Sequence, residues 1–412
     1  LKAGSTHFYE PSLEELIKRN SKGGRLFFRT CYEEIKQADM VFIAVGTPPL
    51  SDGSANVSSI ISASNMLAKY LRGYTVIVNK STAPIGTTLQ VKKEIFESLK
   101  NSSPSLSDTQ MPSFDVIACP EFLKEGSAVH DCLKPDRIVV GYDSKKALTK
   151  LTELYKPFNI NCNRIISMDI PSAELTKYAS NAMLASRISF MNEISRICEV
   201  VGADINSIRH GMSGDHRIGK DFLYAGLGYG GSCFPKDIKA LIASAKKIHI
   251  KTPLLSAIEE VNENQKKFFF KKISDYFKKI GGLKSKVIAI WGLSFKPNTD
   301  DIREAPALKL IDFLLKNEAF VKIFDPVATT NVTLHYNNNN NIIACSSEYH
   351  AADNADGIVL ATEWPQFRLV NLKEIHHRMN GNVIFDGRNQ YDSKTLCEKG
   401  FEYVNVGTKN LI

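Results

Sequence analysis

The sequence lacks the features of a membrane or secreted protein. None of its apolar runs reaches the roughly 18 residues of a membrane-spanning helix. The first residues, LKAGSTHFYEPSLEE, contain no apolar core of a secretion signal. We therefore expect a soluble, cytoplasmic protein with no membrane partner. The chain begins with Leu rather than Met, as expected of a fragment, a processed product or an incomplete gene model.

Cysteine pairs and metal-ligand spacings are also missing. No C-x-x-C pair occurs, and a disulfide framework is not expected in a chain of 412 residues without a secretion signal. His376 and His377 are adjacent but have no companion ligands in the pattern, so we predict no metal site. The eight cysteines are Cys31, Cys119, Cys132, Cys162, Cys198, Cys233, Cys345 and Cys397.

Charge of one sign is only slightly in excess. The net charge of +8 is weak evidence for a nucleic-acid partner and is compatible with an anionic small molecule. Many lysines fall within residues 266–286, KKFFFKKISDYFKKIGGLKSK, where apolar residues recur at helical spacing. We interpret these lysines as the solvated face of a helix and predict no nucleic-acid partner.

Apolar segments of strand length recur in the first part of the chain. They are nearly continuous in apolar residues, as strands covered on both faces are. Helical patterns separate most of them, which predicts a parallel α/β sheet. Residues 101–113 predict a polar surface loop. The predicted strands cover residues 25–30, 39–46, 74–82, 114–121 and 136–143.

The middle of the chain is helical, and α/β alternation then resumes. Ser172 predicts the N-cap of a long helix, and the lysine-rich helix is expected to end at Gly281 and Gly282. A helix over 305–317 and a loop at the NNNNN tract (337–341) follow. This order predicts two or three domains. The later strands are predicted over 286–295, 321–326, 356–362, 382–388 and 401–407.

The stretch GLGYGGSCFPKD (226–237) joins a glycine-rich loop to a cysteine. Cysteine is a strong nucleophile only as the thiolate, and Lys236, three residues after Cys233, is a cation that favours the thiolate. Glycines let the backbone come close to a ligand. Taken alone, the stretch fits a nucleophile and a turn with a buried thiol equally well.

Two pairs of polar residues, each four positions apart, favour the nucleophile. Glu121 and Glu125 in CPEFLKEG would share one face of a helix, as would Lys177 and Asn181 in ELTKYASN. An isolated pair of this kind usually marks an exposed helix face. Lys177 and Asn181, however, lie on a segment rich in apolar residues, where buried polar side chains need partners.

Five segments carry a family resemblance: PEFLKEG, ELTKYASNAMLASRISFMNEIS, RIGKDFL, GYGGSCFPKD and GLSFKPNTDDIREAPA. Together they resemble the UDP-glucose/GDP-mannose dehydrogenase family over nearly the whole chain. The resemblance implies two Rossmann-like, doubly wound parallel-sheet domains joined by a central all-helical domain. It places an NAD-binding domain at 1–168, a helical dimerisation domain at 169–282 and a UDP-sugar-binding domain at 283–412.

The resemblance also implies a two-step, four-electron oxidation of UDP-glucose to UDP-glucuronate that reduces two NAD. Cys233 matches the family nucleophile, which forms a thiohemiacetal and then a thioester. Lys177 matches a lysine that stabilises the oxyanion, and Asn181 would hydrogen-bond at the same place. Asp237 and Thr82 match residues that hold a catalytic water, and Glu121 matches a glutamate implicated in thioester hydrolysis.

The same resemblance implies the binding residues. The cofactor contacts are Val45, Thr47, Pro48, Ser81, Thr82, Glu125, Lys236 and Arg303. The substrate contacts are Glu121, Phe122, Leu123, Glu125, Lys177, Asn181, Tyr224, Gly228, Tyr229, Gly230, Phe295, Lys296 and Arg388. Arg217 matches an arginine that reaches the substrate from a neighbouring subunit, so a homodimer, or a higher oligomer, is expected.

The family's glycine-rich G-x-G-x-x-G turn is not found before FYEPSLEELIKRN. GLSFKPN (292–298) lacks the glycine spacing, and its family counterpart binds the substrate nucleotide. We therefore expect the first βαβ unit, with the main pyrophosphate site, to be missing and NAD binding or folding to suffer. Two alternatives stay open: another nucleotide-sugar dehydrogenase, such as the GDP-mannose enzyme, or a catalytically silent nucleotide-sugar-binding remnant.

Overall fold

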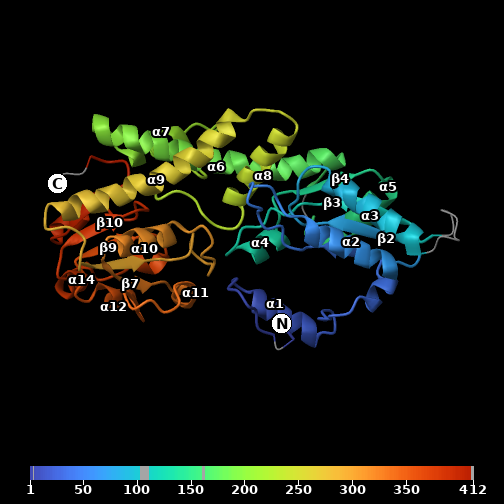
Figure 1. Ribbon diagram of the computed structural model, residues 1–412, viewed down its shortest axis with the longest axis horizontal. Coiled ribbons are helices and arrows are strands. Elements are labelled where there is room, and N and C mark those ends of the chain that lie inside the picture. Colours follow the sequence, from blue (N-terminus) through green and yellow to red (C-terminus); the bar gives the residue numbers. More distant parts are fainter. Residues whose placement is uncertain (3, 103–110, 160–162, 410–412) are drawn as a thin grey trace. The chain divides into compact units, whose positions relative to one another are not determined.

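A computed structural model describes residues 1–2, 4–102, 111–159 and 163–409 of the chain (Figure 1). Contacts divide it into two compact units, Leu1–Asn181 with Lys236–Lys251, and Ala182–Pro235 with Thr252–Ile412. Cys162 and most of the loop predicted over 101–113 lie outside the described residues. Among those described, no helix is long and apolar enough to cross a membrane.

The first unit is built on a five-stranded sheet with the order β1-β2-β3-β4-β5. β4 runs antiparallel to β3, whereas the other neighbours are parallel. One junction therefore differs from the parallel sheet expected, and β5 lies where no strand was predicted. The strands are β1 (Met40–Ile43), β2 (Thr75–Asn79), β3 (Phe114–Ala118), β4 (Ile138–Tyr142) and β5 (Ile165–Met168).

Helices cover both faces of this sheet. Ile77 of β2 packs with residues of α2 and α3 in one apolar cluster. Val76 and Val78, on the opposite face, pack in a second cluster with residues of α5. Burial on both faces explains why β2 is continuously apolar. The helices of this part are α1 (Leu13–Lys22), η1 (Glu33–Gln37), α2 (Ser58–Tyr70), α3 (Thr87–Ser102), α4 (Ala128–Leu133), α5 (Lys145–Tyr155) and η2 (Lys156–Phe158).

The strand predicted over 25–30 is not formed. These residues are irregular, and the Phe27 side chain is 59% exposed. A strand needs a neighbour for its backbone N–H and C=O groups, and the described residues pair none with this segment. The apolar pattern alone is therefore insufficient here.

Long helices form the middle of the chain: α6 (Ile170–Val201), α7 (Ile205–Ser213), α8 (Phe234–Lys247) and α9 (Pro253–Lys278). α6 begins before Ser172, so Ser172 is not its N-cap as predicted. Asp169 accepts instead, from the Ser172 backbone N–H at 2.9 Å and its hydroxyl at 2.7 Å. After α9, Gly281 and Gly282 have positive φ, and Gly282 donates to Phe277 at 2.8 Å, which closes the helix as the glycine pair predicted.

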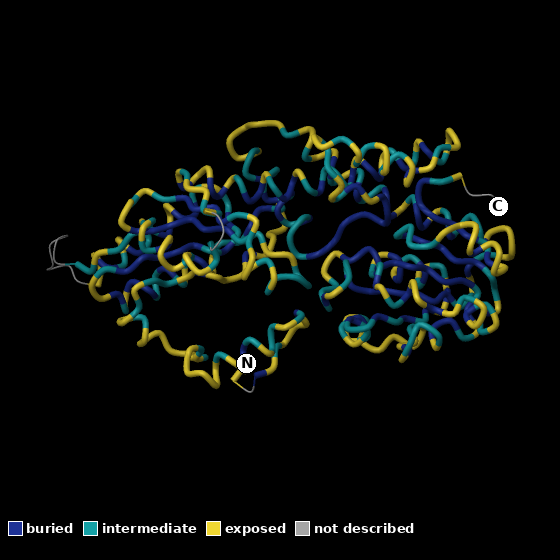
Figure 2. The backbone as a smooth tube through the Cα atoms, turned by 180° about the vertical axis from the view of Figure 1, so that it is seen from behind, coloured by how far each residue is buried: buried dark blue, intermediate teal, exposed yellow. Residues whose placement is uncertain are grey.

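The second unit contains a six-stranded, wholly parallel sheet with the order β11-β10-β9-β6-β7-β8. Strand order reverses between β6 and β9, the type of point where doubly wound folds bind ligands at the carboxyl ends of their strands. Figure 2 shows buried strands beneath more exposed helices. The strands are β6 (Val287–Trp291), β7 (Phe320–Phe324), β8 (Ile342–Ala344), β9 (Gly357–Leu360), β10 (Val383–Asp386) and β11 (Glu402–Asn405). The helices are α10 (Pro306–Lys316), α11 (Thr329–His335), α12 (Glu348–Ala352), α13 (Pro365–Arg368), α14 (Leu372–Arg378) and α15 (Ser393–Glu398).

Candidate active site

Helix α6 carries two buried polar side chains one turn apart. Lys177 is 3% exposed, and its Nζ lies 3.1 Å from Glu121 Oε1 in an ion pair. The same ammonium lies 5.2 Å from the centre of the Phe122 ring. Asn181, also buried, donates its Nδ2 to Asp237 Oδ2 at 2.6 Å. The structure thus brings four of the residues implied by the resemblance into two pairs, of which Asn181–Asp237 is buried and Lys177–Glu121 is partly buried.

Helix α8 begins directly after Cys233. The half-buried thiol therefore stands at the N-terminal end of a helix, where the helix dipole favours a thiolate. Its Sγ lies 3.5 Å from the Ser232 hydroxyl. Asp237 is one helical turn further on, 1% exposed, and is paired with Lys236. Lys236 thus pairs with a carboxylate, so it is not an isolated cation beside the thiol.

Two loops at the carboxyl ends of β1 and β2 are tied together by hydroxyl groups. The Ser81 hydroxyl donates to the Val45 carbonyl at 2.8 Å and accepts from the Val45 N–H at 2.9 Å. Thr47 donates its hydroxyl to the Thr82 carbonyl at 2.7 Å. Pro48 is exposed beside them. Five of the predicted cofactor contacts therefore lie together: Val45, Thr47, Pro48, Ser81 and Thr82. The Ser81 hydroxyl, however, is used to hold the two loops together.

The segment PEFLKEG is a loop, and the prediction that Glu121 and Glu125 share a helical face is wrong. α4 begins only at Ala128. Glu121 Oε2 instead accepts from the Leu123 N–H at 2.6 Å. Glu10, from the start of the chain, accepts from the N–H groups of Gly126 at 2.7 Å and Ala128 at 2.8 Å. These carboxylates take backbone donors that a helix would otherwise use.

Glu174 is a buried residue that sequence reasoning missed. Its two carboxylate oxygens accept from the N–H groups of Gly86 at 2.6 Å and Thr88 at 2.8 Å, at the start of α3. Burial raises the pKa of Glu174, and the hydrogen bonds from Thr88 and Gly86 oppose that rise. A small cavity lies at this point, lined by Asn79, Ser81, Thr82, Ala83, Ala118, Pro120, Glu174 and Lys177. The polar residue that ends the apolar strand β2, Asn79, was a usable signal for it.

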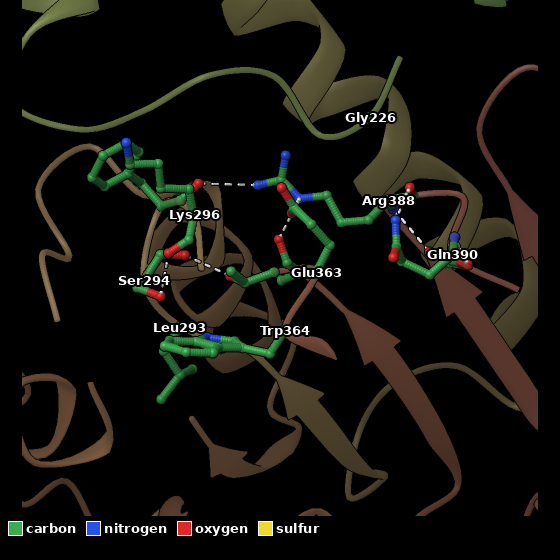
Figure 3. A network of polar contacts seen from close by, with 12 residues as sticks. Gly226, Leu293, Ser294, Lys296, Glu363, Trp364, Arg388 and Gln390 are labelled. Atoms are coloured by element: carbon green, nitrogen blue, oxygen red, sulfur yellow. Dashed lines mark hydrogen bonds and ion pairs between the residues drawn. The ribbon is translucent and has the colours of Figure 1, made fainter. Parts of the chain in front are cut away.

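In the second unit, the turn after β6 is organised by a buried carboxylate that was also missed. Asp325, at the end of β7, accepts from the Leu293 N–H at 2.7 Å and from the Trp364 indole at 3.1 Å. Thr362, after β9, donates to the Ser294 carbonyl. The ends of β6, β7 and β9 thus converge on the turn that leads to Phe295 and Lys296 (Figure 3).

Arg388 connects three segments at this turn (Figure 3). Its Nε donates to the Ala361 carbonyl at 2.7 Å and lies 3.2 Å from Glu363 Oε2. One of its terminal nitrogens donates to the Phe295 carbonyl at 3.4 Å. The predicted substrate arginine is thus brought beside Phe295, and Glu363 is a partner that the sequence did not reveal.

The loop 224–231 packs its backbone against other backbone. A Cβ on Gly226 would lie 2.7 Å from the Gly387 carbonyl, and one on Gly230 would lie 2.3 Å from the Glu304 carbonyl. The Gly231 N–H donates to the Arg303 carbonyl at 2.8 Å. Glycine is therefore required here by the close approach of the protein's own segments, whereas the sequence led us to expect a ligand as the close neighbour.

Three predicted contacts are more exposed. Arg217 is 79% exposed and forms a bidentate ion pair with Asp215, with its Nη2 2.6 Å from Oδ2. Arg303 pairs in the same way with Asp301, at 2.7 Å. The exposed Tyr224 ring has the Arg209 guanidinium 4.5 Å from its centre.

The predicted site residues fall into both units. In the first are Val45, Thr47, Pro48, Ser81, Thr82, Glu121, Phe122, Leu123, Glu125, Lys177, Asn181, Lys236 and Asp237; in the second are Arg217, Tyr224, Gly228, Tyr229, Gly230, Cys233, Phe295, Lys296, Arg303 and Arg388. Among the described residues, no group of three or more His, Cys, Asp or Glu side chains is placed to hold a metal ion.

Family models match the chain in three consecutive parts. Residues 1–159 match the UDP-glucose/GDP-mannose dehydrogenase family, NAD binding domain. Residues 171–264 match the central domain of that family, and residues 289–393 match its UDP binding domain.

Relatives match over the same length. The UDP-glucose 6-dehydrogenase YwqF of Bacillus subtilis is 42% identical, covering 100% of this chain and 90% of the relative. A UDP-glucose 6-dehydrogenase of Pseudomonas aeruginosa is 41% identical, covering 99% and 89%. The solved structure of a UDP-glucose dehydrogenase from Pyrobaculum islandicum is 33% identical, with a TM-score of 0.86, and the match covers 98% of this chain and 88% of that one.

Proposed function

The chain belongs to the UDP-glucose/GDP-mannose dehydrogenase family, and we propose that it oxidises UDP-glucose to UDP-glucuronate. It is an NAD-dependent nucleotide-sugar dehydrogenase. The observation that supports UDP-glucose is the 42% identity, over the whole chain, to a relative named for that substrate. The side chains of Lys177, Asn181 and Asp237 are buried, and Lys177 and Asn181 pair with Glu121 and Asp237, respectively. These pairs support a catalytic function, because polar and charged groups are costly to bury without a role.

Cys233 acts as the nucleophile in the second oxidation. The sugar C6 alcohol is first oxidised to an aldehyde, which must gain a nucleophile before it can lose another hydride. The Cys233 thiolate adds to the aldehyde carbon and forms a thiohemiacetal. Oxidation of this adduct gives a thioester, and water cleaves the carbon–sulfur bond to release the carboxylate and restore the thiol. The position of Cys233 before α8 supports this role.

The buried side chains of α6 and α8 stabilise charge and move protons. Lys177 stabilises the oxyanion that develops on the sugar oxygen, and Asn181 donates a hydrogen bond there. Asp237 and Thr82 hold the hydrolytic water, and Glu121 assists thioester hydrolysis. The contact between Lys177 and Glu121 at 3.1 Å supports proton exchange between these two groups.

The loops after β1 and β2 fit NAD, because they stand at the carboxyl ends of parallel strands. Val45, Thr47, Pro48, Ser81, Thr82 and Glu125 would hold it there, with Lys236 and Arg303. NAD supplies the hydride acceptor for both oxidations. The sugar nucleotide is bound by the 224–230 loop and by the turn with Phe295, Lys296 and Arg388, which lie at or beside the switch point of the second sheet.

Arg217 contacts the substrate of a neighbouring subunit, so the protein acts as a homodimer. Its high exposure supports this assignment. We also propose domain limits at 1–168, 169–282 and 283–412, for which the support is that the family models match residues 1–159, 171–264 and 289–393.

Purified protein incubated separately with UDP-glucose and GDP-mannose tests the substrate. We expect NADH formation with UDP-glucose only, with two NADH for each UDP-glucuronate measured by chromatography. Exclusive turnover of GDP-mannose would contradict the substrate. Failure to bind NAD in a calorimetric titration would contradict the dehydrogenase activity of this chain.

A further inference from the structure

We propose that Asn262 and Gln265 of α9, together with Asn192 of α6, are positioning residues that hold the 226–229 loop in the conformation that binds the sugar nucleotide. All three side chains are buried, with at most 1% exposed. The inference rests on the proposed function in one respect, namely that the 224–230 loop binds the substrate.

We call Asn192, Asn262 and Gln265 the clamp. Two of these residues, Asn192 and Gln265, bind the backbone N–H and carbonyl groups of Gly226. The Gly226 N–H donates to Asn192 Oδ1 at 2.8 Å. The Gly226 carbonyl accepts from Gln265 Nε2 at 3.0 Å. Arg196 donates its Nε to Gln265 Oε1 at 3.0 Å, which fixes the orientation of the Gln265 amide. The donor and acceptor of one peptide position are thus satisfied by two helices.

The third clamp residue, Asn262, binds both the backbone N–H and the carbonyl of Tyr229. The Tyr229 N–H donates to Asn262 Oδ1 at 2.8 Å, and Asn262 Nδ2 donates to the Tyr229 carbonyl at 3.2 Å. The loop passes so close that a Cβ on Gly228 would lie 2.5 Å from Asn262 Oδ1. The amide of Asn262 supplies both the donor and the acceptor that this arrangement needs.

This arrangement leaves one buried amide nitrogen without a hydrogen bond among the described residues, which is a cost in stability. Asn192 Nδ2 is buried without a hydrogen-bond partner in the described part of the chain, although its Oδ1 serves Gly226. Leu227, between the clamped positions, is buried in the apolar core. Without the three amides, the N–H and carbonyl groups of Gly226 and Tyr229 would be left unpaired in apolar surroundings.

The consequence concerns substrate affinity. A loop already fixed in its bound conformation loses little conformational freedom when the ligand binds. Loss of the hydrogen bonds of one of these side chains should therefore weaken sugar-nucleotide binding roughly tenfold, which corresponds to about 1.4 kcal/mol. NAD binding should stay unchanged, because its predicted contacts do not include this loop.

The test uses Asn262→Leu and Gln265→Met in the full chain, with Asn264→Leu as the matched control. Asn264 is a half-buried amide on the same helix. Steady-state kinetics should show KM for UDP-glucose raised roughly tenfold in both clamp variants, with KM for NAD within about twofold of wild type and the control unchanged. Equal effects on both KM values, or no effect on either, would overturn the proposal.

A further variant, Gln265→Glu, keeps the proposal testable if the clamp variants do not fold. Gln265→Glu keeps the size of the side chain and an acceptor for Arg196, but removes the donor to Gly226. Calorimetric titration of UDP-glucose gives a readout without turnover, so a wild type that binds UDP-glucose and does not oxidise it contradicts the proposed function alone. Wild-type affinity in a folded Gln265→Glu variant contradicts the clamp alone.

Discussion

Asn181 donates its side-chain amide to Asp237 at 2.6 Å, within a fully buried contact that joins α6 to α8. The contact lies one helical turn from Lys177 on α6 and one turn from Cys233 on the chain that enters α8. Asp237 Oδ1 forms an ion pair with Lys236, and Asp237 Oδ2 accepts a hydrogen bond from Asn181. This buried carboxylate is therefore both paired with a cation and hydrogen-bonded.

Asn181→Ala should therefore reduce both stability and activity. Removing the amide leaves a buried Asp237 oxygen without its donor, which costs about 1–3 kcal/mol in the free energy of unfolding. The value of kcat should also fall, because Asn181 is proposed to bind the reacting oxygen. Urea unfolding and steady-state kinetics measure the two effects. Ser180→Ala, at a half-buried position next to it, is the control, and equal stability of the two variants would contradict this account.

Cys233→Ser should stop production of UDP-glucuronate while UDP-glucose binding persists. A serine hydroxyl is a far weaker nucleophile than a thiolate, so the aldehyde is not converted into a covalent adduct. Product chromatography and calorimetric titration of UDP-glucose check the two halves of this prediction. UDP-glucuronate formed at a rate near that of wild type would remove Cys233 from the mechanism.

Gly228→Ala should raise KM for the sugar nucleotide and lower stability. Gly228 has a φ of +95°, and its added Cβ would meet Asn262 Oδ1 at 2.5 Å. A side chain in this backbone region costs about 1–2 kcal/mol even before the overlap is counted.

Gly211→Ala in α7 is the matched control for this substitution. Its Cβ would meet nothing within 4 Å, and its φ is not positive. The control should gain about 0.5–1 kcal/mol, as expected of alanine in a helix. Thermal or urea unfolding of both variants measures the difference, and similar stabilities would show that the loop is not constrained at Gly228.

Glu174→Gln should change how stability depends on pH. Burial raises the pKa of Glu174 in the folded protein. The folded state therefore keeps this proton to a higher pH than the unfolded chain, and the wild type loses stability as pH rises from the ordinary carboxyl range through the raised pKa. The variant cannot titrate at this position.

The stability advantage of the wild type over Glu174→Gln should thus be largest at low pH and shrink across that window. Urea unfolding of both proteins from about pH 4 to about pH 8 checks the sign, because it spans the ordinary carboxyl range and the region above it. An advantage that grows with pH would mean that the hydrogen bonds from Gly86 and Thr88 outweigh burial.

Much of the fold could be predicted because it depends on local pattern. Continuous apolar runs located β2 and β3, since both faces of these strands are covered. The same logic failed at residues 25–30, where a strand-like run has no neighbour to pair with. It also missed β5, a strand of only four residues whose side chains are partly buried or exposed.

Part of the candidate site could likewise be predicted from the sequence. The helical spacing of Lys177 and Asn181 on an apolar segment indicated buried polar groups, and both are buried. The helical face expected for Glu121 and Glu125 was wrong, because the carboxylates of Glu121 itself and of the distant Glu10 accept from backbone donors of that segment. Glu10 lies 116 residues before Gly126, and no local pattern announces such a partner.

The sequence by itself determined most of the strands and helices, the glycine-rich loop that leads to Cys233 and the family to which the chain belongs. These depend on the order and spacing of residues that are close along the chain. Only the tertiary structure decided which partner each buried polar group finds: Lys177 meets Glu121 across 56 residues, and Asn181 meets Asp237 across another 56. A buried donor or acceptor must be satisfied, but many residues could satisfy it, and packing of the helices selects one.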